Sequence, residues 1–487
     1  FLDPACGSGS FLIRAFERTC EHWQRRLTID FRSSRGNEAQ TETAGQSLLT
    51  SAATKEWLKK HRPLCWVDDK TGDVHLTVDL KRKILTQNIY GVDLDSAAVE
   101  VTQLSLYLKM LEGENRTTLE RERELFAEAV AILPPLQDNI KCGNSLIASD
   151  FSIVPEDLVR VNAFDWNVGF EKIMKAGGFD AVIGNPPYGA DFDKECEAYI
   201  RDKYRAVTNS LDSFIMFVEK AGDLLNPRGY FGMIVPSGWV STPSSKKLRE
   251  RFSEQFRPSS FVSLPYDVFD GAYIDTVIVT AKRLAAKESW KTLSDSLVEL
   301  FVFPIRMKVK SVQDFDAFRK VGDCSDWMAG SDKEFLVLSS REQATLIKKL
   351  RSSPATLDSA VEVMRGIETY NPRPAKECRK PKRAFNGEML RYDLDLGPEA
   401  FEGYPPDIEA GKPLRFFTGP RILLRQLLSR KFRLQAVYAE TEFLTNQSIQ
   451  SLIPRENSPS IKFSLAILNS RLLSWFFCQI NMVARRD

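Results

Sequence analysis

The sequence predicts an α/β protein in which a doubly wound, mostly parallel sheet is followed by a smaller C-terminal α+β domain. Short apolar runs alternate with helical segments through about residue 285, which is typical of parallel sheets with helices on both faces. Polar or glycine-rich turns follow several of these runs, at the strand ends where such sheets bind ligands. The alternation then stops. We therefore expect one domain over 1–285, a connector over 286–360 and a second domain over 361–487.

The composition is that of a globular protein, since the 487 residues are 43% hydrophobic and 27% charged. No apolar run is long enough to span a bilayer and no signal peptide is evident, so we expect a cytoplasmic location and no membrane partner. The eight cysteines form no C-x-x-C pair and the three histidines no ligand pattern, which predicts neither disulfides nor a metal site. The chain opens at Phe1 inside an apolar run, and we interpret it as a fragment whose first strand is cut short.

The first element is a strand end, followed by a glycine loop and a helix through about Cys20. Gly7 and Gly9 permit positive φ angles and close approach of a ligand, and the helix start behind them leaves free N–H groups. Asp3, just before the loop, favours a ligand with an amino group over a phosphate. An ordinary loop remains an alternative, because a lone G-x-G is a weak signal.

A second strand, 89–95, ends in Asp93, where a ribose hydroxyl pair is usually held in a βαβ unit. A solvated strand-end acid is the alternative. Between the two strands, residues 31–56 are polar and small, which predicts an insertion or loop outside the core. The helix after the second strand has one apolar face, made by Val101, Leu104, Leu108 and Leu111.

Further strands are expected at 140–146, 179–183, 230–236, 261–264 and 276–280, with a helix over 211–225. The strand at 179–183 runs into Asn-Pro-Pro-Tyr at 185–188. Two prolines fix the backbone and remove two N–H donors, which leaves the Asn185 amide oxygen and the Pro186 carbonyl as rigid acceptors beside the ring of Tyr188. Such a cluster suits an exocyclic amino group on a flat base, although Asn-Pro is also a common strand stop.

In the second domain, residues 411–433 carry seven basic side chains, interleaved with phenylalanines and without an acid. A basic segment of this kind fits a phosphate-contacting surface, and a solvated charged face is the alternative. The basic residues are Lys412, Arg415, Arg421, Arg425, Arg430, Lys431 and Arg433. An apolar helix is expected near the C-terminus, over 465–476.

The motifs at 3–11, 91–95, 143–146 and 185–188, in this order, resemble those of the gamma-group adenine-specific DNA methyltransferases. This family includes the TaqI methyltransferase and the type IIG restriction–modification enzymes. The resemblance is strong over 1–285. It is weaker over 361–476, which is similar to the target-recognition domain of those enzymes. It implies a Rossmann-like methyltransferase sheet, S-adenosylmethionine as cofactor, double-stranded DNA as substrate, a prokaryotic source and a restriction–modification or phage-defence role.

The resemblance also assigns roles to matching positions. Asn185 and Pro186 of the Asn-Pro-Pro-Tyr motif would accept hydrogen bonds from the target adenine, and Tyr188 would stack on the base through its ring. Phe269 would stack on the other face. Asn144 stands where the family more often has Asp, so cofactor affinity is in question there. The implied catalytic residues are Asn185, Pro186, Pro187 and Tyr188; the implied cofactor-binding residues are Asp3, Ala5, Gly7, Gly9, Asp93, Leu94, Asn144 and Ser145.

Two other classes of function stay open. One is an amino-group methyltransferase acting on RNA or on a protein glutamine, although such chains are usually shorter and lack a large C-terminal domain. The other is a non-catalytic DNA-specificity subunit. No nuclease-like carboxylate–lysine cluster is evident, so any nuclease would lie outside this segment.

Overall fold

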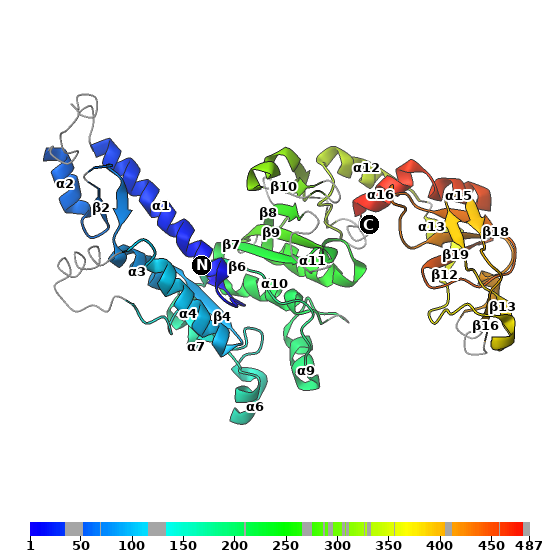
Figure 1. Ribbon diagram of the computed structural model, residues 1–487, viewed down its shortest axis with the longest axis horizontal. Helices are drawn as coiled ribbons and strands as arrows, with labels where there is room; N and C mark the ends of the chain where they lie inside the picture. Colours follow the sequence, from blue (N-terminus) through cyan, green and yellow to red (C-terminus); the bar gives the residue numbers. More distant parts are fainter. Residues whose placement is uncertain are drawn as a thin grey trace. The chain divides into compact units, whose positions relative to one another are not determined.

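The computed structural model describes residues 1–34, 52–68, 70–114, 133–208, 211–264, 275–285, 288–290, 296–303, 307, 311–325, 327–328, 333–354, 356–404, 412–456 and 458–480. The chain forms two compact units (Figure 1). One comprises Phe1–Pro236, Ser244–Val262 and Thr276–Ser296, and the other Ser237–Pro243, Ser263–Asp275 and Leu297–Asp487.

The largest sheet has nine strands in the order β11-β10-β8-β9-β7-β6-β1-β4-β5. Strands β1, β4, β5, β6 and β7 pair in parallel, whereas β7 pairs with β9 and β10 with β11 in antiparallel fashion. The predicted α/β class is thus confirmed as a mixed sheet with a parallel half. The strands are β1 Leu2–Asp3, β4 Tyr90–Asp93, β5 Ile140–Cys142, β6 Phe179–Gly184, β7 Leu225–Pro236, β8 Phe256–Ser263, β9 Thr276–Arg283, β10 Leu297–Val302 and β11 Arg319–Asp323.

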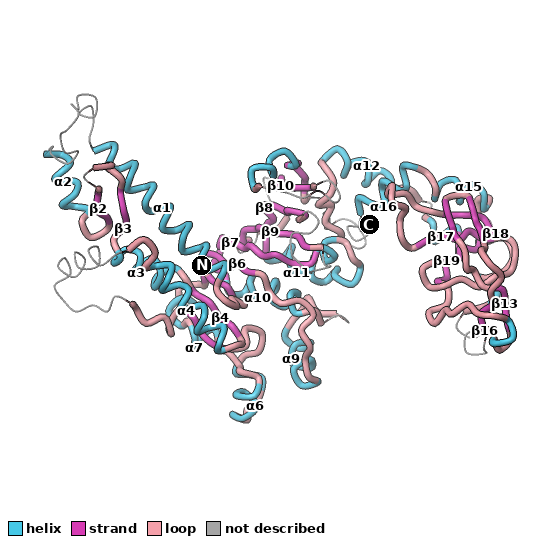
Figure 2. The backbone as a smooth tube through the Cα atoms, in the orientation of Figure 1, coloured by secondary structure: helices cyan, strands magenta, loops and turns pink. Residues whose placement is uncertain are grey.

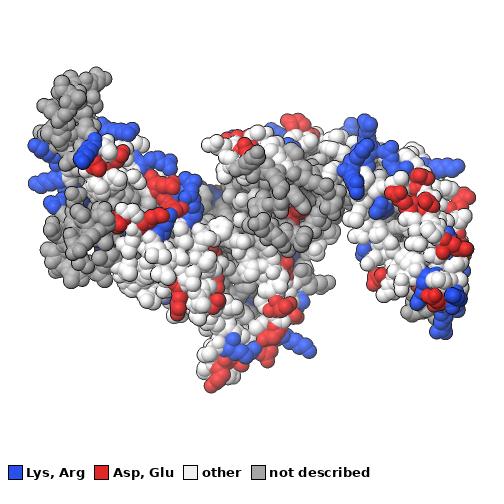
Figure 3. Space-filling model, viewed as in Figure 1, with Lys and Arg blue, Asp and Glu red and all other residues white. Residues whose placement is uncertain are grey.

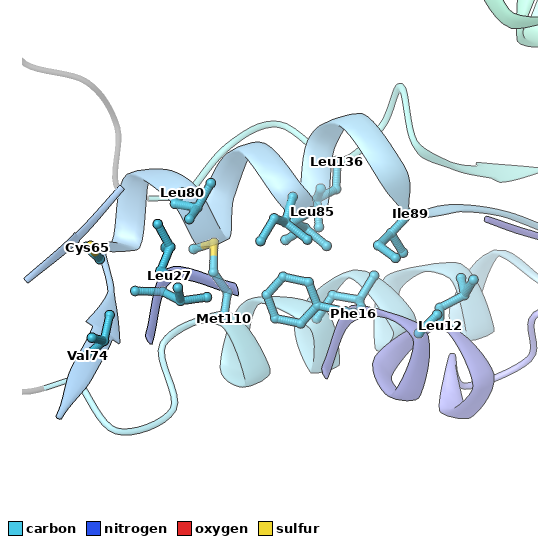
Figure 4. Close-up of a cluster of buried hydrophobic side chains, with 14 of the residues drawn as sticks. Leu12, Phe16, Leu27, Cys65, Val74, Leu80, Leu85, Ile89, Met110 and Leu136 are labelled. Atoms are coloured by element: carbon cyan, nitrogen blue, oxygen red, sulfur yellow. The ribbon is translucent and has the colours of Figure 1, made fainter. Parts of the chain in front are cut away.

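A core beside the parallel strands joins helices α1 (Ser10–Ser34), α3 (Val78–Asn88) and α4 (Ser96–Met110) to a small hairpin, β2 (Cys65–Val67) with β3 (Val74–Leu76). Figure 4 shows Leu12, Phe16 and Leu27 of α1 facing Leu85 of α3 and Met110 of α4. Helix α2 (Ala52–His61) adds Trp57, whose ring packs 5.0 Å from that of Phe31.

Three predictions about this region are corrected. Helix α1 continues past Cys20 to Ser34. The polar segment 31–56 is not wholly a loop outside the core, because Phe31 is 1% exposed at the end of α1 and α2 starts at Ala52; residues 35–51 lie outside the described part. The apolar face expected on α4 is turned to solvent, since Val101, Leu104 and Leu108 are 48–64% exposed. The buried side of α4 carries Val99, Thr102, Leu106 and Met110.

The rest of this unit carries the helices between β5 and β8. Helix α10 packs against β6 and β7 and buries the apolar residues expected from the sequence, among them Phe214, Phe217 and Val218. The helices are α6 Pro155–Arg160, α7 Trp166–Gly169, α8 Glu171–Lys175, α9 Lys194–Lys203, α10 Ser213–Leu224 and α11 Lys246–Gln255.

The C-terminal part contains a four-stranded antiparallel sheet in the order β12-β19-β17-β18 (Figure 2). Its strands are β12 Val361–Arg365, β17 Arg421–Arg425, β18 Ala436–Ala439 and β19 Ile449–Pro454. Two two-stranded antiparallel sheets accompany it: β13 (Pro381–Arg383) with β16 (Phe401–Gly403), and β14 (Glu388–Leu390) with β15 (Asp393–Asp395).

The predicted connector and final helix also need correction. Residues 286–360 hold β10 and β11 of the nine-stranded sheet, where β10 alternates exposed and buried side chains, as well as α12 (Arg341–Arg351) and α13 (Leu357–Ala360). The expected C-terminal helix is two helices, α15 (Ile461–Leu468) and α16 (Arg471–Ile480), bent by 58°. Among the described helices none could cross a bilayer alone, and this bent pair passes such a test only by length and composition.

Candidate active site

The glycine loop after β1 is held from several sides. The Gly7 N–H donates to Asp93 Oδ2 at 2.7 Å, and Thr102 Oγ1 donates to the Gly7 carbonyl at 2.7 Å. Gly7 and Gly9 have φ angles of +52° and +82°. A Cβ at Gly9 would lie 2.7 Å from Thr102 Cγ2, whereas one at Gly7 would meet no atom within 4 Å. The loop is therefore packed on the helix side and open on its outer side.

Asp3 is the buried carboxylate behind this loop. Its side chain is 2% exposed, and its Oδ1 accepts the Ala5 N–H at 3.0 Å. Burial raises the pKa of Asp3 to about 7; the Ala5 hydrogen bond opposes the rise and nearby Asp93 adds to it. A buried acid with one backbone partner and an acidic neighbour suits a cationic group, in agreement with the amino-group ligand expected from the sequence.

Asp93 ends β4, the parallel neighbour of β1. Its Oδ2 accepts from Gly7, and its Oδ1 accepts the Asp95 N–H at 3.0 Å, so the carboxylate is fixed in direction. Each oxygen keeps a further lone pair for a hydroxyl. Leu94, the next residue, is 59% exposed.

Asn144 and Ser145 follow β5, and both side chains bind backbone. Asn144 Oδ1 accepts the Leu146 N–H at 3.0 Å, and its Nδ2 donates to the Val161 carbonyl at 3.3 Å. Ser145 is buried, and its Oγ donates to the Pro4 carbonyl at 2.5 Å. Ser145 thus supports the glycine loop from the end of β5, two strands away from β1, while the Asn144 oxygen retains one lone pair.

The Asn-Pro-Pro-Tyr segment follows β6, on the other side of β1. Asn185 is exposed, and Pro186 is buried. Within the described part of the chain, the Pro187 carbonyl accepts from Ser213 Oγ at 2.6 Å, whereas no hydrogen bond reaches the Pro186 carbonyl. The Gly189 N–H donates to Asp212 Oδ1 at 2.9 Å, so the start of α10 holds the segment from behind.

The two motifs touch at the strand ends. A Cβ at Gly184, the last residue of β6, would lie 2.7 Å from Asp3 Oδ1. Asn185, the first residue of the acceptor pair, directly follows this Gly184. The pair therefore lies next to the Asp3 carboxylate behind the glycine loop. This places the two predicted sites at one edge of the sheet, as their positions after parallel strands require.

The hydroxyl of Tyr188 lies within hydrogen-bond distance of two acceptors, a feature that the expected stacking role does not require. Its Oη lies 2.7 Å from Asn185 Oδ1 and 2.9 Å from the Ile234 carbonyl. Its ring packs edge-on against Phe214, with ring centroids 6.2 Å apart. Burial, and then the charge of Asp212, raises the pKa of Tyr188 to about 12, so the hydroxyl is a donor at neutral pH. Phe269, expected to stack on the opposite face of a base, lies outside the described residues.

Comparisons with known families give these two regions an identity. Residues 87–269 match the Eco57I restriction-modification methylase family, and residues 382–487 match the TaqI-like C-terminal specificity domain. The chain therefore contains a region similar to the Eco57I methylases, followed by a region similar to the TaqI-like specificity domain. The prediction of this family from the sequence motifs is confirmed.

Two curated relatives of this chain are much longer. It is 30% identical over 269 residues to the type II restriction enzyme and methyltransferase RM.Eco57I of Escherichia coli, covering 54% of this chain and 22% of that protein. It is 24% identical over 339 residues to the putative type II restriction enzyme and methyltransferase RM.MjaORFECS2P of Methanocaldococcus jannaschii, covering 68% and 28%. The chain thus spans about a quarter of the length of these relatives.

Solved structures support the fold of the chain. One is the Type IIL restriction-modification enzyme MmeI in complex with DNA, with a TM-score of 0.52 and 13% identity over 96% of this chain and 58% of that chain. Another is a nuclease-deletion mutant of the Type ISP enzyme LlaGI with a DNA substrate mimic, with a TM-score of 0.52 and 10% identity over 93% and 39%. At these identities the likeness concerns the fold alone.

The match to a methylase family implies S-adenosylmethionine as cofactor, in agreement with the prediction. The residues at the strand ends fit this cofactor. Asp3 offers a buried carboxylate for its amino group, and the outer side of Gly7 is open for close approach. Asp93 presents fixed acceptor oxygens. In the described part of the chain, no group of three or more His, Cys, Asp and Glu side chains could hold a metal ion.

In the TaqI-like specificity domain, the seven basic residues of 411–433 do not form one surface. Arg421 is 0% exposed, and its guanidinium donates to the carbonyls of Gly419 and Thr441, so the prediction that it contacts phosphate is wrong. Arg433 donates to Ser474 Oγ of α16 and to the Asn469 carbonyl at 2.7 Å, so it ties the segment before β18 to the two C-terminal helices.

Of the other five basic residues, two bind protein partners, one is half-buried and two are exposed. Lys412 Nζ donates to the Gly366 carbonyl at 2.5 Å, and Arg415 forms an ion pair with Glu362 at 2.8 Å. Arg425 is half-buried. Arg430 and Lys431 are exposed, and no described partner binds their side chains.

The sequence patterns did not predict a second basic segment, or the side chains that hold the glycine loop and the Asn-Pro-Pro-Tyr segment in place. The segment 373–383 has six basic residues and one acid, and Arg373, Lys376 and Arg379 on it are exposed. On the face shown in Figure 3, Lys and Arg gather where β13 and β16 lie. A window count of charge over 370–385 would have found this segment. Nothing in the local sequence indicates that Thr102 and Ser213 hold the loops, because they come from distant helices.

Proposed function

We propose that this chain transfers a methyl group from S-adenosylmethionine to the exocyclic amino group of an adenine extruded from double-stranded DNA. The observation that carries the proposal is the acceptor pair at the end of β6. The Asn185 amide and the Pro186 carbonyl stand next to the carboxylate and glycine loop at the end of β1. A base amino group bound by this pair would lie beside the cofactor.

The chain's contribution to the reaction is positioning and polarisation. The amino nitrogen of adenine is a poor nucleophile, because its lone pair is delocalised into the ring. Acceptors fixed on both of its hydrogens favour a tetrahedral nitrogen whose lone pair points at the carbon under attack. S-adenosylmethionine supplies that carbon as an electrophilic methyl group on a sulfonium. The Pro186 carbonyl, without a hydrogen bond from the described chain, is the acceptor whose direction the two prolines fix.

The base must leave the duplex before it reaches this pair, which costs a few kcal/mol. Tyr188 presents a ring at the site, and stacking on an aromatic side chain is worth about 1–3 kcal/mol per base. Phe269 is proposed for the opposite face. The specificity domain supports a role for this chain in DNA binding, and DNA is the substrate proposed here. A nuclease, fused or separate, would lie outside this segment.

The test is methyl transfer by an Asn185→Ala variant of the full-length protein, with tritiated S-adenosylmethionine and unmodified DNA. We expect transfer to fall at least a hundredfold with cofactor and DNA affinities unchanged, because the lost interaction strengthens only at the reacting nitrogen. Asn167→Ala is a matched control, since Asn167 is an exposed amide on α7 in the same unit. Wild-type turnover in Asn185→Ala would contradict the proposal.

The same assay separates the alternative functions. Transfer to RNA or to a protein glutamine, with none to DNA, would identify a different amino-group methyltransferase. DNA binding without transfer to any substrate would identify a specificity subunit. Digestion of the methylated DNA to nucleosides distinguishes N6-methyladenine from methylated cytosine.

A further inference from the structure

The Tyr188 hydroxyl sits between two acceptors and has one hydrogen to donate. Asn185 Oδ1 is 2.7 Å away and the Ile234 carbonyl 2.9 Å away. Pairing of β6 with β7 ends at Gly184 and Met233, so Ile234 is the first β7 residue past the last parallel pair. Beyond Asn185, the chain after β6 offers no backbone N–H at positions 186 and 187, because both are prolines. The hydroxyl thus reaches the backbone where the ladder stops.

This geometry allows the Asn185 amide two orientations, one with a single hydrogen bond to the Tyr188 hydroxyl and one in which the hydroxyl both accepts and donates. In the first, Oδ1 accepts from Tyr188, as the structure has it. In the second, the amide is turned by half a revolution, Nδ2 donates to Tyr188 Oη, and the hydroxyl donates to the Ile234 carbonyl. The terminal torsion of asparagine is broad and roughly two-fold, so both orientations are accessible. Only the second directs Oδ1 away from Tyr188.

We propose that Tyr188 is a positioning residue as well as a stacking ring: its hydroxyl, anchored on the Ile234 carbonyl, receives the Asn185 Nδ2–H and holds Oδ1 toward the incoming amino group. This rests on the proposed function. The arrangement gives Nδ2 a partner in the protein and leaves Oδ1 for the substrate, and it excludes an amide that presents its donor to the substrate. The raised pKa of Tyr188 keeps the hydroxyl protonated for this role.

The first test is Tyr188→Phe in the full-length protein, under single-turnover conditions. The ring is kept, so DNA affinity and the fluorescence of 2-aminopurine at the target position should stay as in the wild type. The rate should fall about tenfold, the equivalent of one lost orienting hydrogen bond. A wild-type rate overturns the proposal. If Asn185→Ala is inactive in the same series, the proposed function stands while this inference fails.

The second test is a double-mutant cycle with Asn185→Asp. A carboxylate has two equivalent acceptor oxygens, so there is no orientation left to choose. If the hydroxyl acts through the amide, Tyr188→Phe should cost less than about threefold when combined with Asn185→Asp, against about tenfold in the wild type. Equal losses in both backgrounds overturn the proposal, because stacking or a general packing role would act independently of residue 185.

Discussion

At the residue scale, the least expected property belongs to Asp3. Its place before the glycine loop is evident in the sequence, but its protonation is a consequence of burial and of Asp93 on the neighbouring strand. With a pKa of about 7, the carboxyl is largely neutral in the cofactor-free protein at pH 6 and charged at pH 8. A cofactor amino group would pair with the charged form.

We therefore predict that S-adenosylmethionine affinity rises between pH 6 and pH 8, as measured by calorimetric titration. Asp3→Asn should bind weakly and show no such rise. The stability of the cofactor-free protein should change in the opposite direction. A carboxyl whose folded pKa is raised stabilises the fold while it is protonated, and this contribution is lost as pH rises from about 4 through about 7. Melting curves of the Asn variant should lack this loss; an identical pH profile would contradict the assignment.

At the scale of elements, β10 and β11 fell in the predicted connector, but strands β4 to β9 were predictable as short apolar runs. The face of α4 was not. Apolar residues occupy both sides of this helix, and periodicity alone cannot choose between them. The buried side includes Thr102, a polar residue that is 0% exposed because it donates to the glycine loop. The inward side therefore combines apolar packing by Val99, Leu106 and Met110 with this hydrogen bond to the loop.

Two strand glycines offer a matched pair for testing the meeting point of β1 and β6. Gly184→Ala would bring a Cβ within 2.7 Å of Asp3 Oδ1, whereas Gly232→Ala on adjacent β7 meets only Ile183 Cγ2 at 3.6 Å. We expect Gly184→Ala to lose about 1–3 kcal/mol of stability, by overpacking, together with cofactor affinity. Gly232→Ala should change stability by less than about 1 kcal/mol. Chemical denaturation measures the stability of both variants. Equal losses would show that the Asp3 side chain can move away from the added Cβ without cost.

At the scale of the whole molecule, the sequence indicated two kinds of domain, but not how the basic residues of the second are divided. Composition could not separate Arg421 from Arg430. Arg421 is buried, and its guanidinium donates to the carbonyls of residues 419 and 441. Pairing in the antiparallel sheet brings these two carbonyls together. Burial lowers the pKa of Arg421 to about 10. Composition was also insufficient for α12 and β10. Their charged sequence led to the prediction of a connector.

This division predicts two separable phenotypes. Neutralising Arg430 and Lys431 should flatten the salt dependence of DNA binding by about 0.9 log unit for each phosphate that the variant no longer neutralises, with a similar weakening on any DNA sequence. Arg421→Ala should instead destabilise the specificity domain by roughly 2 kcal/mol or more, leaving the salt slope unchanged. Filter binding across a salt series, with thermal melts alongside, distinguishes them. An unchanged slope in the double variant would show that these two residues are a solvated face.

The ties around the glycine loop also bear on how fast the site can be filled. Asp93, Thr102 and Ser145 hold Gly7 and Pro4 through hydrogen bonds that need no cofactor atom. The conformational entropy of this loop is thus lost when the protein folds, and binding need not order it again. Association with the cofactor should then be a single exponential whose rate grows linearly with concentration, without the plateau that a slow loop closure would impose.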